Sequence, residues 1–192
     1  MSASDQTGPI EPVGPVGPID PQTEYRDVFT RGTHFLQRGD HVSALPLLER
    51  AHALAPENAD ALLNLGGCLV MAGKFKRAHT LLEQAVLLHP GVTQLWVNLG
   101  AAALGNPVLA TDEKQQRALQ AFEHALTLDP FAPNIEYNIG LIQRDRGELR
   151  LAINAFKLAA DIDPNDTDAR RMAERLQTRL DESARKSDNM DA

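Results

Sequence analysis

The chain has 192 residues, of which 43 % are hydrophobic, enough to bury the core of one domain or one short repeat array. Its formal net charge of −7 disfavours nucleic acid and anionic membrane surfaces as partners, since both need clustered Lys and Arg. The opening residues lack a basic stretch followed by an apolar one, and the most apolar stretch, residues 61–73, is interrupted by Asn64 and glycines, so we expect a cytoplasmic chain without signal peptide or membrane span.

Residues 1–22 form a proline-rich leader that we expect to be disordered. Its prolines recur at positions 9, 12, 15, 18 and 21, in the stretch GPIEPVGPVGPIDP. A period of three is typical of the polyproline II helix. The leader is therefore either a docking peptide for a proline-binding module or, the interpretation that we favour, a stiff solvated spacer.

After the leader, one short phrase occurs three times: LNLGG at 63–67, VNLGA at 97–101 and YNIGL at 137–141. Aligning the chain on this phrase gives four units, at 25–58, 59–92, 93–132 and 133–166. The eighth place of every unit is a glycine, and alanines and a closing proline recur as well; the glycines are Gly32, Gly66, Gly100 and Gly140. Such a period indicates repeated structural units that stack on one another.

These residues resemble the tetratricopeptide repeat family, whose unit is a pair of antiparallel helices. Glycine or alanine leaves room where two helices cross closely, and large residues fill the remaining space between units. The large residues here are Leu48, Leu82, Phe122 and Phe156. The resemblance implies an all-α fold, a right-handed α-solenoid of four helix pairs over residues 23–166 with a C-terminal capping helix.

The third unit has 40 residues where the others have 34. The excess falls within residues 105–116, where Asn106-Pro107 signals a turn and Thr111, followed by two acidic residues, signals a helix start. We expect the insertion to lengthen the turn between the unit's two helices and to add a turn to the second helix. It is either a binding loop or a tolerated surface insertion.

The terminal units depart from the apolar pattern. Arg31 stands where other units have Leu or Ile, and Glu136 and Gln143 occupy usually apolar places, so we expect partly exposed first helices there. Residues 167–186, with Asp166 or Thr167 as N-cap, carry apolar residues along one helical face and are predicted to be the capping helix. Residues 187–192 are predicted to be a disordered tail.

The resemblance also implies a concave groove lined by the first helix of each unit. The peptide-binding residues that it selects here are Phe29, Thr30, Leu63, Asn64, Met71, Val97, Asn98, Tyr137, Asn138, Leu141 and Arg144. The few charges of the wider lining cancel, which disfavours RNA as a ligand. The lining also lacks the basic cluster with which related co-chaperones bind the C-terminal carboxylate of heat-shock proteins.

Three asparagines, Asn64, Asn98 and Asn138, hold the same place in successive units. Helix interiors do not favour Asn, so its recurrence asks for a reason. One hypothesis is a ladder of amides that bonds to the backbone of a bound peptide. The alternative is that each amide bonds to the neighbouring helix and steadies the stack.

The residues offer no pattern for catalysis, a cofactor or a metal. No two of the six histidines stand four apart, and neither a phosphate-binding loop nor a nucleophile motif occurs. Cys68, the single cysteine, is expected to be a packed thiol. We therefore predict a non-catalytic protein–protein interaction module, an adaptor or assembly factor with a protein or peptide partner; the alternative is a self-associating structural scaffold.

Overall fold

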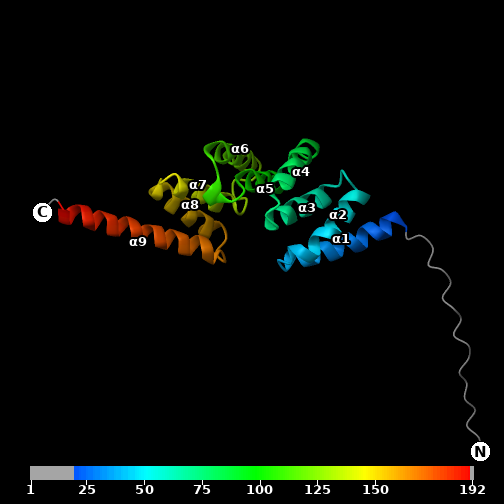
Figure 1. The fold of residues 1–192 in the computed structure, drawn as a ribbon, viewed down its shortest axis with the longest axis horizontal. Coiled ribbons are helices and arrows are strands. Elements are labelled where there is room, and N and C mark those ends of the chain that lie inside the picture. The colour runs from blue at the N-terminus through cyan, green and yellow to red at the C-terminus, as the bar shows by residue number, and fades with distance from the viewer. Residues whose placement is uncertain (1–19, 191–192) are drawn as a thin grey trace, which may run out of the picture.

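The computed structural model describes residues 20–190, with side chains as far as Ser183. Within that range it contains nine α-helices and one short 3₁₀-helix, which follow one another in a row from α1 at one end to α9 at the other (Figure 1). The predicted leader, up to residue 19, and the last two residues of the predicted tail lie outside the described residues.

The helices form consecutive antiparallel pairs that match the four units. Each pair packs tightly, and α8 also packs against α9. The bounds are α1 (Pro21–Gln37), α2 (His41–Leu54), α3 (Ala59–Met71), α4 (Phe75–Leu88), α5 (Thr93–Leu104), η1 (Pro107–Leu109), α6 (Asp112–Leu128), α7 (Ile135–Asp145), α8 (Leu149–Ile162) and α9 (Thr167–Met190). The predicted all-α array of helix pairs is confirmed.

Side-chain caps fix where the first and last helices begin. The Asp20 carboxylate accepts a hydrogen bond from the Thr23 backbone N–H at 3.1 Å, and Pro21 stands at a helix start, where its missing N–H costs nothing. Helix α1 therefore starts inside the segment assigned to the leader. At the other end Asp166 accepts from the Ala169 N–H at 2.9 Å, and α9 continues to Met190, past the predicted end at 186.

Glycine is required where the two helices of a unit cross. A Cβ added to Gly100 would lie 2.4 Å from the Phe122 ring, and one added to Gly66 would lie 2.5 Å from Leu82. Both contacts are far below van der Waals distance, so a side chain at either glycine would force the pair apart. The large residue meets the glycine of its own unit, so it fills the interior of the pair as well as the space between units.

The core is divided among three clusters along the array. The first joins units one and two to α5, the second joins unit three to α7, and the third joins α8 to α9. Trp96 contacts both the first and the second cluster. Each unit thus buries apolar surface against its neighbour, as expected of a repeat array in which single units lack a core of their own.

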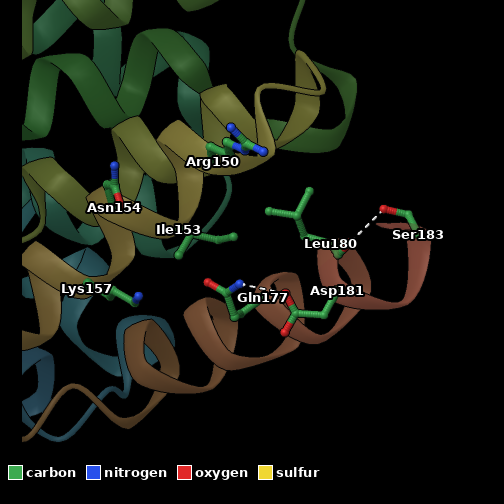
Figure 2. Close-up of a pocket in the computed structure, with 8 residues that line it drawn as sticks. All are labelled: Arg150, Ile153, Asn154, Lys157, Gln177, Leu180, Asp181 and Ser183. Carbon is green, nitrogen blue, oxygen red and sulfur yellow. Dashed lines mark hydrogen bonds between the residues drawn. The ribbon is translucent and has the colours of Figure 1, made fainter. Parts of the chain in front are cut away.

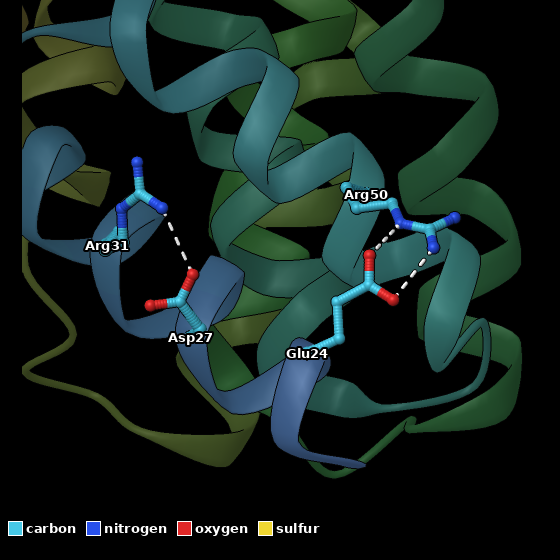
Figure 3. A network of polar contacts seen from close by, with 4 residues as sticks. All are labelled: Glu24, Asp27, Arg31 and Arg50. Carbon is cyan, nitrogen blue, oxygen red and sulfur yellow. Dashed lines mark hydrogen bonds and ion pairs between the residues drawn. The ribbon is translucent and has the colours of Figure 1, made fainter. Parts of the chain in front are cut away.

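Two ion pairs of the first unit, Glu24 with Arg50 and Asp27 with Arg31, are shown in Figure 3. Arg50 of α2 donates two hydrogen bonds to the Glu24 carboxylate of α1, at 2.7 and 2.9 Å, which lowers the Glu24 pKa from its usual value. Arg31 pairs with Asp27 at 3.1 Å, with 59 % of its side chain exposed. The unusual Arg31 therefore lies at the surface of a terminal unit, where an ion pair contributes little stability.

The insertion adds residues to both the turn and the second helix of unit three. Helix α6 has 17 residues, where α4 and α8 have 14 each. The connection before it spans residues 105–111 and holds η1, whereas residues 72–74 suffice between α3 and α4. Thr111 caps α6 by accepting a hydrogen bond from the Lys114 N–H at 3.5 Å. The expected longer turn and extra helical turn are both confirmed.

Candidate functional site

Ten of the eleven residues selected for the groove are at least partly exposed on the first helices α1, α3, α5 and α7. Helix α3 packs against both α1 and α5, which brings the residues of the first three units onto adjacent helices. Thr30 is exposed, Met71 is 50 % exposed, and most of the others are half-buried. We call this surface the groove face: Phe29, Thr30, Leu63, Asn64, Met71, Asn98, Tyr137, Asn138, Leu141 and Arg144.

Val97, which the repeat pattern also selected, is not part of this surface. Its side chain is only 2 % exposed and packs in the second core cluster with Leu104 and Ile142. Its equivalents Leu63 and Tyr137 are half-buried. The same place in the repeat therefore faces the core in unit three and remains partly accessible in the units on either side.

Aromatic and aliphatic residues of the groove face are anchored from below. Phe29 stacks on Tyr25 with ring centroids 5.5 Å apart, and Phe29 packs against the first core cluster. Tyr137 meets the Phe156 ring edge-on at 5.4 Å, and Leu141 packs against the same third cluster. These side chains are held in place while part of each stays accessible, so a ligand that covered them would order little on binding.

The asparagine amides of the groove face already donate hydrogen bonds within the protein. Asn64 Nδ2 donates to Thr33 Oγ1 of α1 at 2.8 Å, and Asn98 Nδ2 donates to the Leu63 carbonyl of α3 at 3.4 Å. Asn138 Nδ2 instead donates to the Asn134 carbonyl at the start of its own helix at 2.7 Å. Two asparagines therefore connect successive units, as the alternative to the ladder expects, and the third does not.

Charge on the groove face is nearly neutralised. Arg144 contacts Asp145 at 2.7 Å, and both side chains are 22 % exposed. Burial, with smaller contributions from Asp168 and Asp166, raises the Tyr137 pKa, so this phenol keeps its proton at neutral pH and can donate a hydrogen bond. The arrangement suits an apolar segment with polar backbone groups.

Four cavities of the described region are lined by residues outside the groove face. One of 440 Å³ lies between α2 and α4, and one of 640 Å³ lies between α4 and the insertion. Two more, of 550 and 510 Å³, lie between α8 and α9. Figure 2 shows the first of these, lined by Arg150, Ile153, Asn154, Lys157, Gln177, Leu180, Asp181 and Ser183. The repeat pattern did not predict these cavities. The extra length of unit three was the one sequence signal, and it concerned the cavity beside the insertion.

The described residues carry little that suggests chemistry. Cys68 is buried, burial raises the pKa of its thiol, and its Sγ lies 3.5 Å from the His41 carbonyl oxygen, so the thiolate that would act as a nucleophile is disfavoured. Between residues 20 and 190 no three His, Cys, Asp or Glu side chains gather to hold a metal ion. In the same range no helix combines the length and apolar character that a bilayer crossing needs.

Models of one repeat family match most of the array. Two tetratricopeptide repeat models match residues 35–103 and 108–167, which together make up more than half of the chain. The matches agree with the glycine-centred helix pairs described above. The chain belongs to the tetratricopeptide repeat family.

Curated relatives match the chain over part of their own length. BBSome complex member BBS4 of Bos taurus is 28 % identical over 126 residues, 66 % of this chain and 23 % of the relative. Protein O-mannosyl-transferase TMTC1 of Homo sapiens is 24 % identical over 142 residues, 72 % of this chain and 15 % of the relative. The chain thus spans less than a quarter of the length of either protein.

Solved structures share the fold along most of the chain. A thermophilic TPR protein of Thermus thermophilus superimposes with a TM-score of 0.71 at 20 % identity, covering 81 % of this chain and 82 % of that one. MamA of Desulfovibrio magneticus superimposes with a TM-score of 0.62 at 20 % identity, covering 87 % and 91 %. At these identities the likeness establishes the architecture.

Proposed function

We propose that the chain is a non-catalytic adaptor or assembly factor whose groove face binds an extended or helical segment of another protein. The observation that carries the proposal is the groove face itself: anchored aromatic and aliphatic side chains, partly exposed, on the first helices of units one, two and four, with almost no net charge. A long, rigid surface of this kind recognises a segment at little ordering cost. Repeats of this family typically mediate protein–protein interactions.

The names of similar proteins support an assembly role. One curated relative is a member of a complex, the BBSome. The transferase relative matches over only 15 % of its length, so the likeness gives no reason to move its activity to this chain. We therefore assign binding, and no reaction, to the array.

The role of the asparagines within this proposal follows from their hydrogen bonds. Because Asn64 and Asn98 donate to neighbouring helices, they are better placed to hold the groove face in shape than to bond a peptide with the same hydrogens. Their carbonyl oxygens are the groups that we propose for accepting backbone N–H groups of the bound segment.

The test compares two aliphatic, half-exposed positions on different surfaces. Met71→Glu places a charge on the groove face, where Met71 is 50 % exposed, and Leu151→Glu does the same on α8, where Leu151 is 52 % exposed. Partners captured from native lysate by the wild type are identified by mass spectrometry, purified, and titrated against both variants. We expect Met71→Glu to weaken binding at least about tenfold and Leu151→Glu to leave it unchanged.

If Met71→Glu bound every partner as tightly as the wild type does, the proposal that the groove face is the binding site would be wrong. Light scattering over a range of protein concentrations distinguishes binding of another protein from self-association, the scaffold alternative. A mass that rises with concentration in the wild type but not in Met71→Glu would show that the bound segment belongs to another copy of this chain.

A further inference from the structure

The insertion of unit three forms one wall of a cavity that lies on a different surface from the groove face. The cavity, of 640 Å³, lies between helix α4 of unit two and the segment formed by η1 and the first turns of α6. Its volume falls in the range of pockets that hold a ligand group of several heavy atoms. One wall comes from Phe75, Lys76, His79, Thr80 and Glu83, which recur along one side of α4.

The opposite wall exists because the insertion extends the chain at this point. Leu109 belongs to η1, and Lys114 belongs to the turn by which α6 exceeds the other second helices. Gly105 makes the bend that starts the insertion, with a φ of 66°, a conformation that side chains other than glycine rarely adopt. A Cβ at Gly105 would lie 3.6 Å from the Phe75 ring. The end of α5 therefore lies next to the start of α4.

Positive charge gathers around this cavity in a chain of net charge −7. Lys76 on one wall and Lys114 on the other have no ion-pair partner among the described residues. Arg117 is paired with Glu113 at 2.7 Å. His79 Nδ1 contacts the Glu83 carboxylate at 3.2 Å, which is an ion pair only when the imidazole is protonated, so Glu83 is the acidic group of the lining. Two uncompensated ammonium groups therefore stand on opposite sides of the opening, where each would contact a carboxylate between them.

The same cavity has an apolar side. Phe75 and Ala103 form part of its lining, and Leu109 is 73 % exposed at its edge. Its neighbour Val108 is 76 % exposed as well. Leu109 is thus an exposed aliphatic side chain in the same lining as the Phe75 ring, which gives a surface that a bulky apolar group would cover favourably.

We propose that this cavity binds an acidic peptide segment of a partner protein, with one bulky apolar side chain inserted between α4 and η1. Carboxylates on either side of that side chain pair with Lys76 and Lys114. Charge complementarity selects this ligand: nucleic acid would need cations along a continuous track, and a small free anion would leave the apolar wall unused. The site is separate from the groove face and does not depend on the function proposed for it.

The experiment uses the full chain and a synthetic peptide as the probe. A fluorescein-labelled peptide with two acidic residues on each side of a central Phe-Leu pair is titrated with protein at low salt, and binding is followed by fluorescence anisotropy. The wild type is expected to bind saturably, and the affinity to fall as salt is added, because exposed ion pairs are screened.

Two variants test the two parts of the cavity. Lys76→Glu with Lys114→Glu, both exposed positions, is expected to weaken binding at least about tenfold, since two attractions become repulsions. The matched control, Arg150→Glu with Lys157→Glu on α8, makes the same change in net charge at the cavity of Figure 2 and is expected to bind as the wild type does. Leu109→Ser, at a position that is 73 % exposed, is expected to weaken binding several-fold.

Several results would overturn the proposal. Absence of saturable binding by the wild type would do so, and so would equal losses in the two charge-reversal variants, which would reduce the effect to net charge. A peptide with Ala-Ala in place of Phe-Leu that binds equally well would show a simple anion site. Met71→Glu is expected to bind the probe normally, so the outcome here is distinct from that for the groove face.

Discussion

The junction between units two and three differs from the junction between units three and four. At the first, Leu62, Leu65 and Leu69 of α3 share a buried cluster with Leu95 and Leu99 of α5. At the second, α7 contributes few fully buried side chains, Ile135 and Ile142 among them. A regular repeat of sequence therefore does not give regular cohesion between units.

Two places of α7 hold polar residues where α3 holds leucines. Glu136 stands at the place that Leu62 holds in unit two, and burial raises its pKa. Gln143 stands at the place of Leu69, and its buried Oε1 has no hydrogen-bond partner within the described part of the chain. Each polar residue costs folding free energy relative to the leucine of unit two, because a buried polar group gives up its hydration.

Gln115 and η1 both contribute contacts at the second junction. Arg146 Nε, just after α7, donates to Gln115 Oε1 of α6 at 2.8 Å, and η1 packs against α7. The extra residues of unit three thus lie beside both neighbours, α4 on one side and α7 on the other. Where the apolar interface is thin, a hydrogen bond and an added segment take part in holding the units together.

The largest expected contrast comes from truncating the same repeat place in two units. Leu99 is 8 % exposed within the first cluster, so Leu99→Ala is expected to lower the free energy of unfolding by about 2–5 kcal/mol. Ile139 is only partly buried, so Ile139→Ala is expected to lower the free energy of unfolding by only about 1 kcal/mol. Urea unfolding of both variants measures the difference; equal losses would show that the two junctions are equally cohesive.

The second contrast concerns the polar bond between α6 and α7. Gln115 is 4 % exposed, so Arg146→Ala leaves its Oε1 buried without a donor and is expected to cost about 1–3 kcal/mol. The control is Arg117→Ala, which removes an exposed pair with Glu113 and should cost about 0–1 kcal/mol. Thermal unfolding of both variants tests this, and a similar small shift for each would mean that water replaces the guanidinium at Gln115.

A smaller contrast involves the asparagines. Asn64 bonds to the preceding unit, so Asn64→Ala is expected to destabilise the protein by about 0.5–1.5 kcal/mol. Asn138 bonds only within its own unit, and Asn138→Ala is expected to be neutral or slightly stabilising, because Ala has the higher helix propensity. The comparison fails if denaturant midpoints for the two variants shift by the same amount.

The smallest expected effect is a pH dependence at Glu136. Its pKa in the folded protein is raised above the usual 4.5, so the folded state holds the proton more tightly than the unfolded state does. The stability contributed by this group is full below pH 4.5 and is lost as pH rises through the raised pKa. Glu136→Gln is expected to remove that loss. Melting temperatures of both proteins from acid to neutral pH should converge at the acid end, and parallel curves would contradict the assignment.

Much of the array could be predicted from the sequence, because the residues that define a helix pair act locally. Glycine and its large partner recur at fixed separation, and Thr111 with the acidic residues after it marks the start of α6. The late start of α7 was not predictable, since Asn134 adopts a left-handed conformation, with φ at 69°, after Pro133. Asn tolerates the left-handed conformation, but the residue type alone does not show where a chain adopts it.

The repeat pattern selected the positions of the groove face, whereas the burial and hydrogen bonding of each position depend on packing. Val97 has the residue type expected of a lining position, and only the packing of α7 and Leu104 shows that it is buried. The hydrogen bonds of the asparagines likewise depend on which neighbour each amide reaches across the unit boundary. The cavity beside the insertion depends on the path of η1, for which the sequence offered only a turn signal.

The position of the extra helical turn has a practical consequence. Because the added residues precede Gln115, the part of α6 that follows keeps Ala118 and Phe122 in register with Ala78 and Leu82, and all four are 0 % exposed. An addition within the helix would instead rotate every later side chain by about 100° per residue. This corner of unit three can accept new sequence without turning the rest of the array.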